Sequence, residues 1–463
     1  MNNDLPLRAG MTSRRYAKQA VRAFKADDAC PAHAPLKMLA LLVFAAAIAG
    51  CGGGGGSGGG GNVIPSFVSP ANVTISDINR DGAPDIVVSA ATVQSAPPHA
   101  GFVAVLTQKP QARGTFSASI RYAAEFDPSG LAVADLSGSG AEDVVVGSLN
   151  KAGATLPDNI VVLRHDPGNA GALLSPQLLS TGSHGINDVA VGDVNGDGLP
   201  DIVVTTNPTS AGATILVFTQ SNTQPGTFVL SQSIVTATRS GAIALADLNG
   251  DGRLDIAVTS AVDNAPGTMQ VFLQNASTPG TFLAPTGYAV GLQPVALAVG
   301  DLNGDGKPDL AVVNQGAGDG SNPSVSVLLQ NAAMPGQFSN QISLPAARAP
   351  MAIAIADIDG DGKQDIVTAN ASGAPPFDGS VQIYFQQAPG AFGSPVKLGS
   401  FQGSYTLAVG DLNGDQAPDI VVNDGEGIAI LFQNGKPVKQ MVGYQPRERL
   451  EAQITPFLQL EKA

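Results

Sequence analysis

The chain lacks several residue types that stabilise loops or bind ligands in other proteins. Its 463 residues include no tryptophan, four histidines and two cysteines, Cys30 and Cys51. Two cysteines cannot form a disulfide framework, and the histidines form no cluster with metal-ligand spacing. The absence of tryptophan also disfavours a surface on which sugar rings stack. The loops of this protein must therefore be held by something other than disulfide bonds.

Catalytic motifs are scarce as well. Three Gly-Lys pairs, which begin at Gly306, Gly362 and Gly435, are not followed by serine or threonine, so none forms a phosphate-binding loop. The one Gly-x-Ser-x-Gly match, residues 55–59, falls inside a run of glycines. We therefore predict no catalytic residues and a protein that is not an enzyme.

Glycine and acidic residues are what the chain has in quantity. It contains 56 glycines and 33 prolines, and this composition is typical of short strands joined by many turns. The formal net charge is −14. The first 50 residues hold seven basic and three acidic residues, which leaves 17 basic against 35 acidic residues, a net charge of −18, for the rest. Such an acidic body repels nucleic acid and attracts cations.

The N-terminus has the pattern of an export signal. Seven basic residues precede or flank an apolar run, residues 38–50, that is too short to span a membrane comfortably. We predict a signal peptide over residues 1–50. The sequence of residues 48–51, Ile-Ala-Gly-Cys, resembles the lipobox of bacterial lipoproteins, and this resemblance implies cleavage before Cys51 and acylation of that cysteine. The alternative is an ordinary signal peptide with an incidental cysteine.

The segment after the cysteine supports a tether. Residues 51–62 contain the predicted lipidated Cys51 and a glycine-rich linker that cannot pack. The predicted location is therefore the bacterial cell envelope, with the protein exported and lipid-anchored to a membrane. Gly52 stands where an aspartate would mark retention in lipoproteins, which favours the outer membrane.

Seven internal repeats indicate the fold. Nine-residue loops begin at intervals of 54 to 58 residues, and each follows a strand of small residues and precedes an apolar β-branched strand. A third apolar strand, a turn that typically contains Pro-Gly-x-Phe, and a more polar fourth strand complete each unit. The loops begin at Asp77, Asp135, Asp193, Asp247, Asp301, Asp357 and Asp411.

Four strands in a repeat of about 55 residues make one blade of a propeller. The predicted fold is all-β, a seven-bladed β-propeller with four-stranded antiparallel blades, over residues 63–444, followed by a C-terminal tail, residues 445–463. A solenoid or a string of separate domains is the alternative. Each unit is too long for a solenoid coil and too small to bury a core alone, so a closed ring is preferred.

The loops carry the chemistry. Five of them match Asp-x-[Asn/Asp]-x-Asp-Gly-x-x-Asp in full. Oxygen ligands at positions 1, 3 and 5 can converge on one hard cation, glycine at position 6 permits the sharp turn, and the last aspartate can close the shell. This pattern predicts Ca²⁺ as the cofactor. The predicted ligands are Asp77, Asn79, Asp81 and Asp85; Asp193, Asn195, Asp197 and Asp201; Asp247, Asn249, Asp251 and Asp255; Asp301, Asn303, Asp305 and Asp309; Asp357, Asp359, Asp361 and Asp365.

Two loops are degenerate. The second has Ser137 and Ser139 at positions 3 and 5, so we predict no tight binding there. The seventh retains its oxygens but has Gln416 in place of the glycine, which predicts a weaker site. The predicted ligands of the seventh loop are Asp411, Asn413, Asp415 and Asp419.

The repeats resemble FG-GAP repeats, the blades of the integrin α-subunit propeller, and are most similar to the bacterial VCBS-type members. This resemblance implies a calcium-binding propeller that serves as an adhesion, binding or scaffold module. The alternative is a propeller-based enzyme, a lyase or hydrolase acting on envelope or extracellular glycans. A cluster of non-repeating polar residues on one face would discriminate between them.

The partner expected for a binding module is a protein or glycan. The loops between the second and third strands vary most, and they suit recognition or plain connection better than catalysis. These loops include residues 89–101, 147–159, 314–324 and 370–380. Because the strands of a blade run up and down, we expect the calcium loops on one face of the disc and these variable loops on the other.

Overall fold

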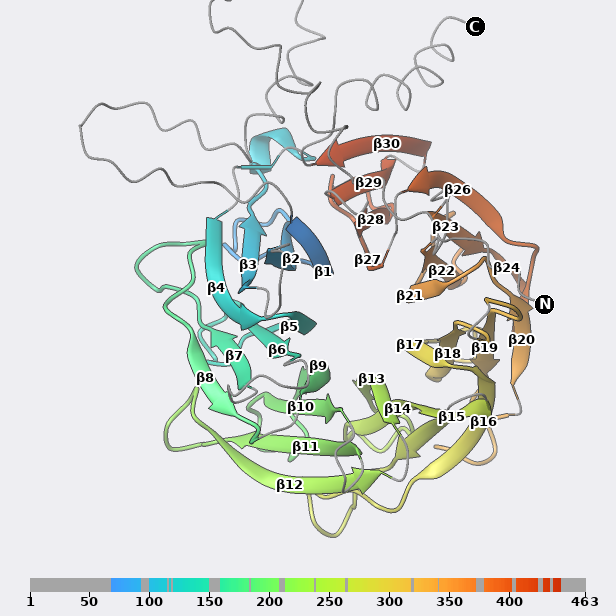
Figure 1. Cartoon of the computed structure of the whole chain (residues 1–463), viewed down its shortest axis with the longest axis horizontal. Coiled ribbons are helices and arrows are strands. Elements are labelled where there is room, and N and C mark those ends of the chain that lie inside the picture. The colour runs from blue at the N-terminus through green and yellow to red at the C-terminus, as the bar shows by residue number, and fades with distance from the viewer. Residues whose placement is uncertain are drawn as a thin grey trace, which may run out of the picture. The chain divides into compact units, whose positions relative to one another are not determined.

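The computed structural model of the chain describes a set of β-sheets and their connecting turns (Figure 1). The predicted signal peptide, Cys51, the linker and the C-terminal tail lie outside the described residues, as do parts of the variable loops. The described residues are 68–92, 100–114, 116–117, 120–149, 159–182, 185–207, 213–236, 239–262, 265–317, 320–339, 341–371, 379–401, 405–423, 428–433 and 436–442.

Within these residues the chain forms seven four-stranded antiparallel sheets and one two-stranded hairpin. The first three sheets are β1 (Val68–Ser76), β2 (Asp85–Thr92), β3 (Ala100–Leu106), β4 (Ile120–Phe126); β5 (Pro128–Ala134), β6 (Asp143–Ser148), β7 (Asn159–Leu163), β8 (Gln177–Ser180); and β9 (Ile186–Gly192), β10 (Asp201–Thr206), β11 (Ala213–Gln220), β12 (Phe228–Thr236). The next two are β13 (Arg239–Ala246), β14 (Asp255–Val262), β15 (Ala265–Phe272), β16 (Thr286–Leu292); and β17 (Pro294–Gly300), β18 (Asp309–Asn314), β19 (Ser324–Leu328), β20 (Ile342–Pro345).

The last sheets are β21 (Pro350–Ala356), β22 (Asp365–Asn370), β23 (Gly379–Tyr384), β26 (Val396–Phe401); and β27 (Leu407–Gly410), β28 (Asp419–Asn423), β29 (Ile428–Gln433), β30 (Lys436–Val442). The hairpin consists of β24 (Gln386–Ala388) and β25 (Ala391–Phe392), and a short 3₁₀ turn, η1, covers Pro110–Ala112. Apart from that hairpin, each sheet uses consecutive strands in chain order, so one repeat makes one sheet.

The sheets have a propeller arrangement. In each sheet the first strand lies nearest the centre in Figure 1 and the fourth lies at the rim. The first strands lie side by side in the order β1, β5, β9, β13, β17, β21 and β27, and β27 lies beside β1. The repeat pattern therefore yields an all-β fold of four-stranded blades, as the sequence predicts.

Burial follows the composition of each strand. The apolar second strands are buried along most of their length. β10 and β18 are buried throughout, whereas β14 is buried up to Ser260 and ends at the exposed Val262. The fourth strands alternate between half-buried and exposed residues, as in β8 and β20. An alternating strand with one solvated face suits the rim, whereas a continuous apolar run must be covered on both faces by neighbouring blades.

Small residues let neighbouring blades approach closely. A Cβ atom added to Gly300, at the end of β17, would lie 2.7 Å from the Cγ2 of Ile355 in β21. The same relation recurs where the last sheet meets the first, because a Cβ atom on Gly410 would lie 3.3 Å from the Cδ1 of Ile75. A glycine in one blade therefore leaves room for a large side chain of the next blade. The contact between Gly410 and Ile75 joins the last sheet to the first.

Candidate functional site

The seven acidic loops connect the first strand of each sheet to the second. Each starts at the residue after the first strand, and its last aspartate is the first residue of the second strand. The opposite ends of the first strands surround one cavity, described below, so the loops lie at the other end of these strands. The predicted metal ligands are thus brought to one face of the propeller.

Hydrogen bonds inside a full loop fix the positions of its side-chain oxygens. In the fifth loop, Asp301 Oδ1 accepts the amides of Gly304 at 2.7 Å and Asp305 at 3.2 Å, and Asp301 Oδ2 accepts the amide of Gly306 at 2.8 Å. Burial alone would raise the pKa of Asp301, but these and another backbone N–H group together lower it. The carboxylate at position 1 is therefore held in its charged form.

Positions 3 and 5 follow the same scheme. Asn303 Oδ1 accepts the Asp305 amide at 2.8 Å, and Asp305 Oδ1 accepts the Lys307 amide at 3.0 Å. Equivalent bonds recur in the loops that start at Asp77, Asp193, Asp247, Asp357 and Asp411. Six loops consequently share one internal geometry.

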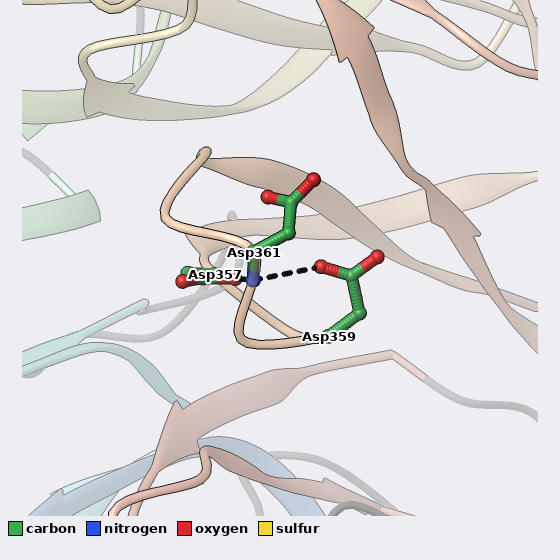
Figure 2. A group of neighbouring side chains, drawn as sticks. All are labelled: Asp357, Asp359 and Asp361. Atoms are coloured by element: carbon green, nitrogen blue, oxygen red, sulfur yellow. Dashed lines mark hydrogen bonds between the residues drawn. The ribbon is translucent and has the colours of Figure 1, made fainter.

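The sixth loop brings three carboxylates together. One oxygen from each of Asp357, Asp359 and Asp361 lies within 4.8 Å of the others, and the last two side chains are exposed (Figure 2). Two such charges at that distance repel by about 1 to 3 kcal/mol, depending on the local dielectric. The Lys363 ammonium contacts Asp361 and relieves part of this repulsion. The remaining charge favours a cation at the loop.

The turn in each loop needs a left-handed backbone at position 6. Glycine there has φ between 78° and 85° in the first six loops. In the seventh loop Gln416 adopts φ 68°, so this side chain takes a conformation that glycine reaches without strain. The loop nevertheless retains its hydrogen bonds, with the Gln416 amide 2.8 Å from Asp411 Oδ2.

The last aspartate of each loop has a structural role that sequence analysis did not assign. Asp309 is fully buried, its Oδ2 accepts the Leu302 amide at 2.8 Å, and its Oδ1 accepts the Gln330 amide at 2.7 Å. Burial raises the pKa of Asp309 to about 6 in spite of these bonds. The residue thus clamps the loop to the end of the third strand, with one lone pair on each oxygen still unused.

The same clamp recurs with one informative exception. Its Oδ2 bond is present in the loops that end at Asp143, Asp201, Asp255, Asp365 and Asp419. In the first loop, Asp85 is fully buried and its Oδ2 has no hydrogen-bond partner. Burial above all, and then the charges of Asp81 and Asp77, raise the pKa of Asp85 to about 7. An orphaned buried carboxylate oxygen beside two other carboxylates fits a cation ligand.

A recurrent glutamine completes the clamp and was missed in the sequence. Gln220 follows the third strand's apolar run, its Nε2 donates to the Pro200 carbonyl at 2.8 Å, and its Oε1 accepts the Gly226 amide at 2.6 Å. It thereby joins the loop to the Pro-Gly turn. Buried glutamines occupy the same place at Gln108, Gln274, Gln330 and Gln386. The recurrence of glutamine at the end of the third strands is the sequence feature from which this contact could have been predicted.

The second loop is closed by protein groups instead. His165 stands in the glutamine position, with Nδ1 2.9 Å from Asp143 Oδ1 and Nε2 3.2 Å from Ser139 Oγ. Arg80, from the first loop, donates to the Ser139 carbonyl at 3.0 Å and lies against Gly140. A guanidinium and an imidazole therefore cover the loop that has lost its oxygens at positions 3 and 5.

Three kinds of comparison describe what the chain is similar to. The FG-GAP-like repeat family matches residues 258–312 and 301–368, and the FG-GAP repeat family matches residues 186–217. Over 56 residues the chain is 45% identical to a thioredoxin from Alicyclobacillus acidocaldarius, which covers 11% of this chain and 53% of that protein. The chain thus spans about half the length of that relative.

Solved structures are similar to this chain at low sequence identity. A 6-phosphogluconolactonase candidate from Bacteroides uniformis is similar over 77% of this chain and 94% of its own, with 14% identity and a TM-score of 0.53. The rhamnogalacturonan lyases YesX and YesW have 15% identity and TM-scores of 0.45 and 0.46. They cover 82% and 83% of this chain and 65% and 76% of their own. In the residues that the structure describes, no helix is long and apolar enough to cross a membrane.

Proposed function

We propose that this chain, which contains FG-GAP repeats and folds as a propeller of four-stranded sheets, is a seven-bladed calcium-binding module that binds or scaffolds a partner at the cell envelope. The observation that carries the proposal is the convergence of Asp357, Asp359 and Asp361 within 4.8 Å. Carboxylate and amide oxygens at positions 1, 3 and 5 are the ligand set that calcium prefers. The orphaned oxygen of Asp85 supports the same assignment in the first loop.

Calcium would crosslink the acidic loops in place of disulfide bonds. In each loop the ion would join oxygens that now meet mainly backbone amides, and it would neutralise part of the acidic body. The opposite face is then free for a partner. A two-carboxylate glycan hydrolase is less well supported, because Asp188 is the one carboxylate among the described residues that lines the central cavity described below.

Counting bound calcium tests the proposal. We expect isothermal titration of the chelator-stripped protein to give five sites from the full loops, with a sixth, weaker site from the loop at Asp411. The second loop should bind none, because Arg80 and His165 already cover it. A protein that binds no calcium in the millimolar range would contradict the proposal.

A gain of one site tests the assignment of the second loop. The variant Ser137→Asn, Ser139→Asp, His165→Gln and Arg80→Gly restores the sequence of the full loops and removes the covering cation. We expect its stoichiometry to rise by one calcium ion. Arg80→Gly alone serves as the control and should leave the stoichiometry unchanged. An unaltered count in a folded fourfold variant would show that these residues do not decide metal binding.

Anchoring is tested at the cysteine. Cys51→Ser should abolish acylation and release the protein from the membrane fraction, because lipid chains supply the anchoring energy in a lipoprotein. The measurement is the share of protein in the membrane pellet after a high-salt wash. A variant that stays in the pellet would show that another segment holds the protein.

A further inference from the structure

A cavity opens where the first strands of the propeller begin. Its volume is about 420 Å³, within the usual range for small-molecule sites. Residues at or next to the start of six first strands line it, together with Asn72 in the middle of β1, so it lies on the axis and on the face opposite the acidic loops. It is therefore separate from the predicted calcium sites.

β-Bulges build the wall of this cavity. The register of β9 against β10 skips Asn187, and the registers of β17 and β21 against their partners skip Val295 and Met351. Similar shifts in β5 and β13 include Ser129 and Gly241. All five of these residues line the cavity. A bulge adds one residue and redirects its side chain, and bulges are frequent beside binding sites.

The cavity is also where the repeats stop being alike. The first strands end in nearly the same small residues, but the residues added by the bulges near their starts differ from blade to blade. Asn72, Ser129 and Asn187 contribute amide and hydroxyl groups to one arc of the wall, whereas the other arc combines the apolar Val295 and Met351 with the amides of Gln293 and Gln315. The wall thus offers apolar as well as polar groups, which suits a ligand of mixed character.

Two opposite charges line the same cavity. Asp188 is half-buried, and its oxygens accept the amides of Val189 at 2.9 Å and Ile243 at 3.1 Å. Burial raises the pKa of Asp188 to about 6, so the group is mostly ionised at neutral pH. Arg239 is exposed. Among the described residues, no ion pair is recorded for either side chain. Each charge is therefore available to a ligand.

The two charges lie at different depths. Arg239 precedes Ile243 by four residues, one of which is added by the bulge in β13. Three strand steps of about 3.3 Å place the backbone of Arg239 about 10 Å nearer the mouth than the amide that holds Asp188. An extended tripeptide spans about the same length, because each residue adds about 3.3 to 3.6 Å.

We propose that this cavity binds a short zwitterionic peptide of about three residues. Its terminal ammonium would meet the Asp188 carboxylate, and its carboxylate would meet the Arg239 guanidinium at the rim. An apolar side chain of the peptide would pack on Val295 and Met351. The proposal rests on the proposed partner-binding face and does not depend on calcium.

The test uses the calcium-loaded full chain and the tripeptide Ala-Leu-Ala in isothermal titration. Arg239→Gln should weaken binding about tenfold or more, since hydrogen bonds to charged groups contribute about 1.5 to 3 kcal/mol. The peptide with an amidated C-terminus should bind the unmodified protein as weakly as the free peptide binds Arg239→Gln. Its affinity should not fall further in the Arg239→Gln variant. The same test applies to the other end of the peptide. The N-acetyl peptide should bind the unmodified protein as weakly as the free peptide binds Asp188→Asn, and Asp188→Asn should cause no further loss with the N-acetyl peptide.

Two controls keep the result interpretable. In Asp188→Asn one backbone amide faces an NH₂ group, so the melting curve of this variant is first compared with that of the unmodified protein. Arg239 is exposed, so Arg239→Gln tests the proposal without a change of fold. Lys397→Gln, on the exposed surface of β26, should bind the peptide as the unmodified protein does. No binding of Ala-Leu-Ala at millimolar concentration would overturn the proposal, and so would binding of the peptide that neither variant weakens. Calcium-dependent melting would still report the proposed function separately.

Discussion

Removal of calcium is expected to lower the free energy of unfolding by about 7 to 14 kcal/mol relative to a solution with about 10 mM calcium. A ligand that binds only the folded state stabilises it by RT ln(1 + [L]/Kd). Dissociation constants of about 10⁻⁴ to 10⁻³ M, typical of extracellular calcium modules, give about 1.4 to 2.7 kcal/mol per site. The total takes the five full loops as independent.

Differential scanning calorimetry with chelator and with calcium measures this effect. A change of that size should move the melting temperature by on the order of 10 °C. Magnesium at the same concentration is the control for ionic strength, since it demands a tighter octahedral geometry than these loops supply. Superimposed melting curves with chelator and with calcium would refute calcium as the staple of this fold.

The buried and the exposed aspartates of one loop should behave differently when each is replaced. Asp309→Ala leaves the amides of Leu302 and Gln330 buried without an acceptor. One unsatisfied buried group costs about 1 to 3 kcal/mol, so the expected loss of stability is about 2 to 6 kcal/mol. Because the lost bonds are internal, the loss should be present with chelator as well as with calcium.

Asp305→Ala is the matched control. Its side chain is exposed and accepts only the Lys307 amide among the described bonds of the loop, so the metal-free protein should lose less than about 1 kcal/mol. In calcium it should lose the contribution of one site, about 1.4 to 2.7 kcal/mol. Urea unfolding with and without chelator measures both variants. A cost of Asp309→Ala that disappears with chelator would make this residue a metal ligand and not a clamp.

The periodic features of the chain could be predicted from its sequence because they depend on local order. Strand positions follow from small and apolar runs, and the acidic loops follow from a nine-residue pattern, so both are visible within one repeat. The propeller arrangement then follows from the repetition itself, since a repeat of about 55 residues cannot bury a core alone. The described sheets confirm these strands and their order.

Contacts between residues far apart in the chain could not be predicted in the same way. The clamp joins Asp85 to Gln108, 23 residues apart, through a bond that exists only once the second and third strands are in register. Arg80 reaches Ser139 over a separation of 59 residues and across two blades. In an alignment of the repeats, Arg80 and His165 look like isolated departures from the pattern, and nothing local shows that both cover the second loop.

The axial cavity was hidden for a related reason. Its wall consists of residues that differ from blade to blade, such as Asn187 and Met351, and in a sequence such positions look like tolerated variation. The bulges that turn them inward are a property of strand pairing. Non-repeating polar residues on one face were expected in the loops between the second and third strands, whereas those of the cavity lie near the starts of the first strands.

The seam between the last sheet and the first has a consequence for how the protein is made. Every sheet comes from one contiguous stretch of chain, so the first sheet can form early, yet its partner strand β27 is synthesised more than 300 residues after β1. At about 5 to 20 residues per second the delay is roughly 20 to 70 seconds. During that interval Ile75 lacks the cover of Gly410. A nascent chain therefore displays an apolar flank where it can associate with a second copy, until its own final blade arrives.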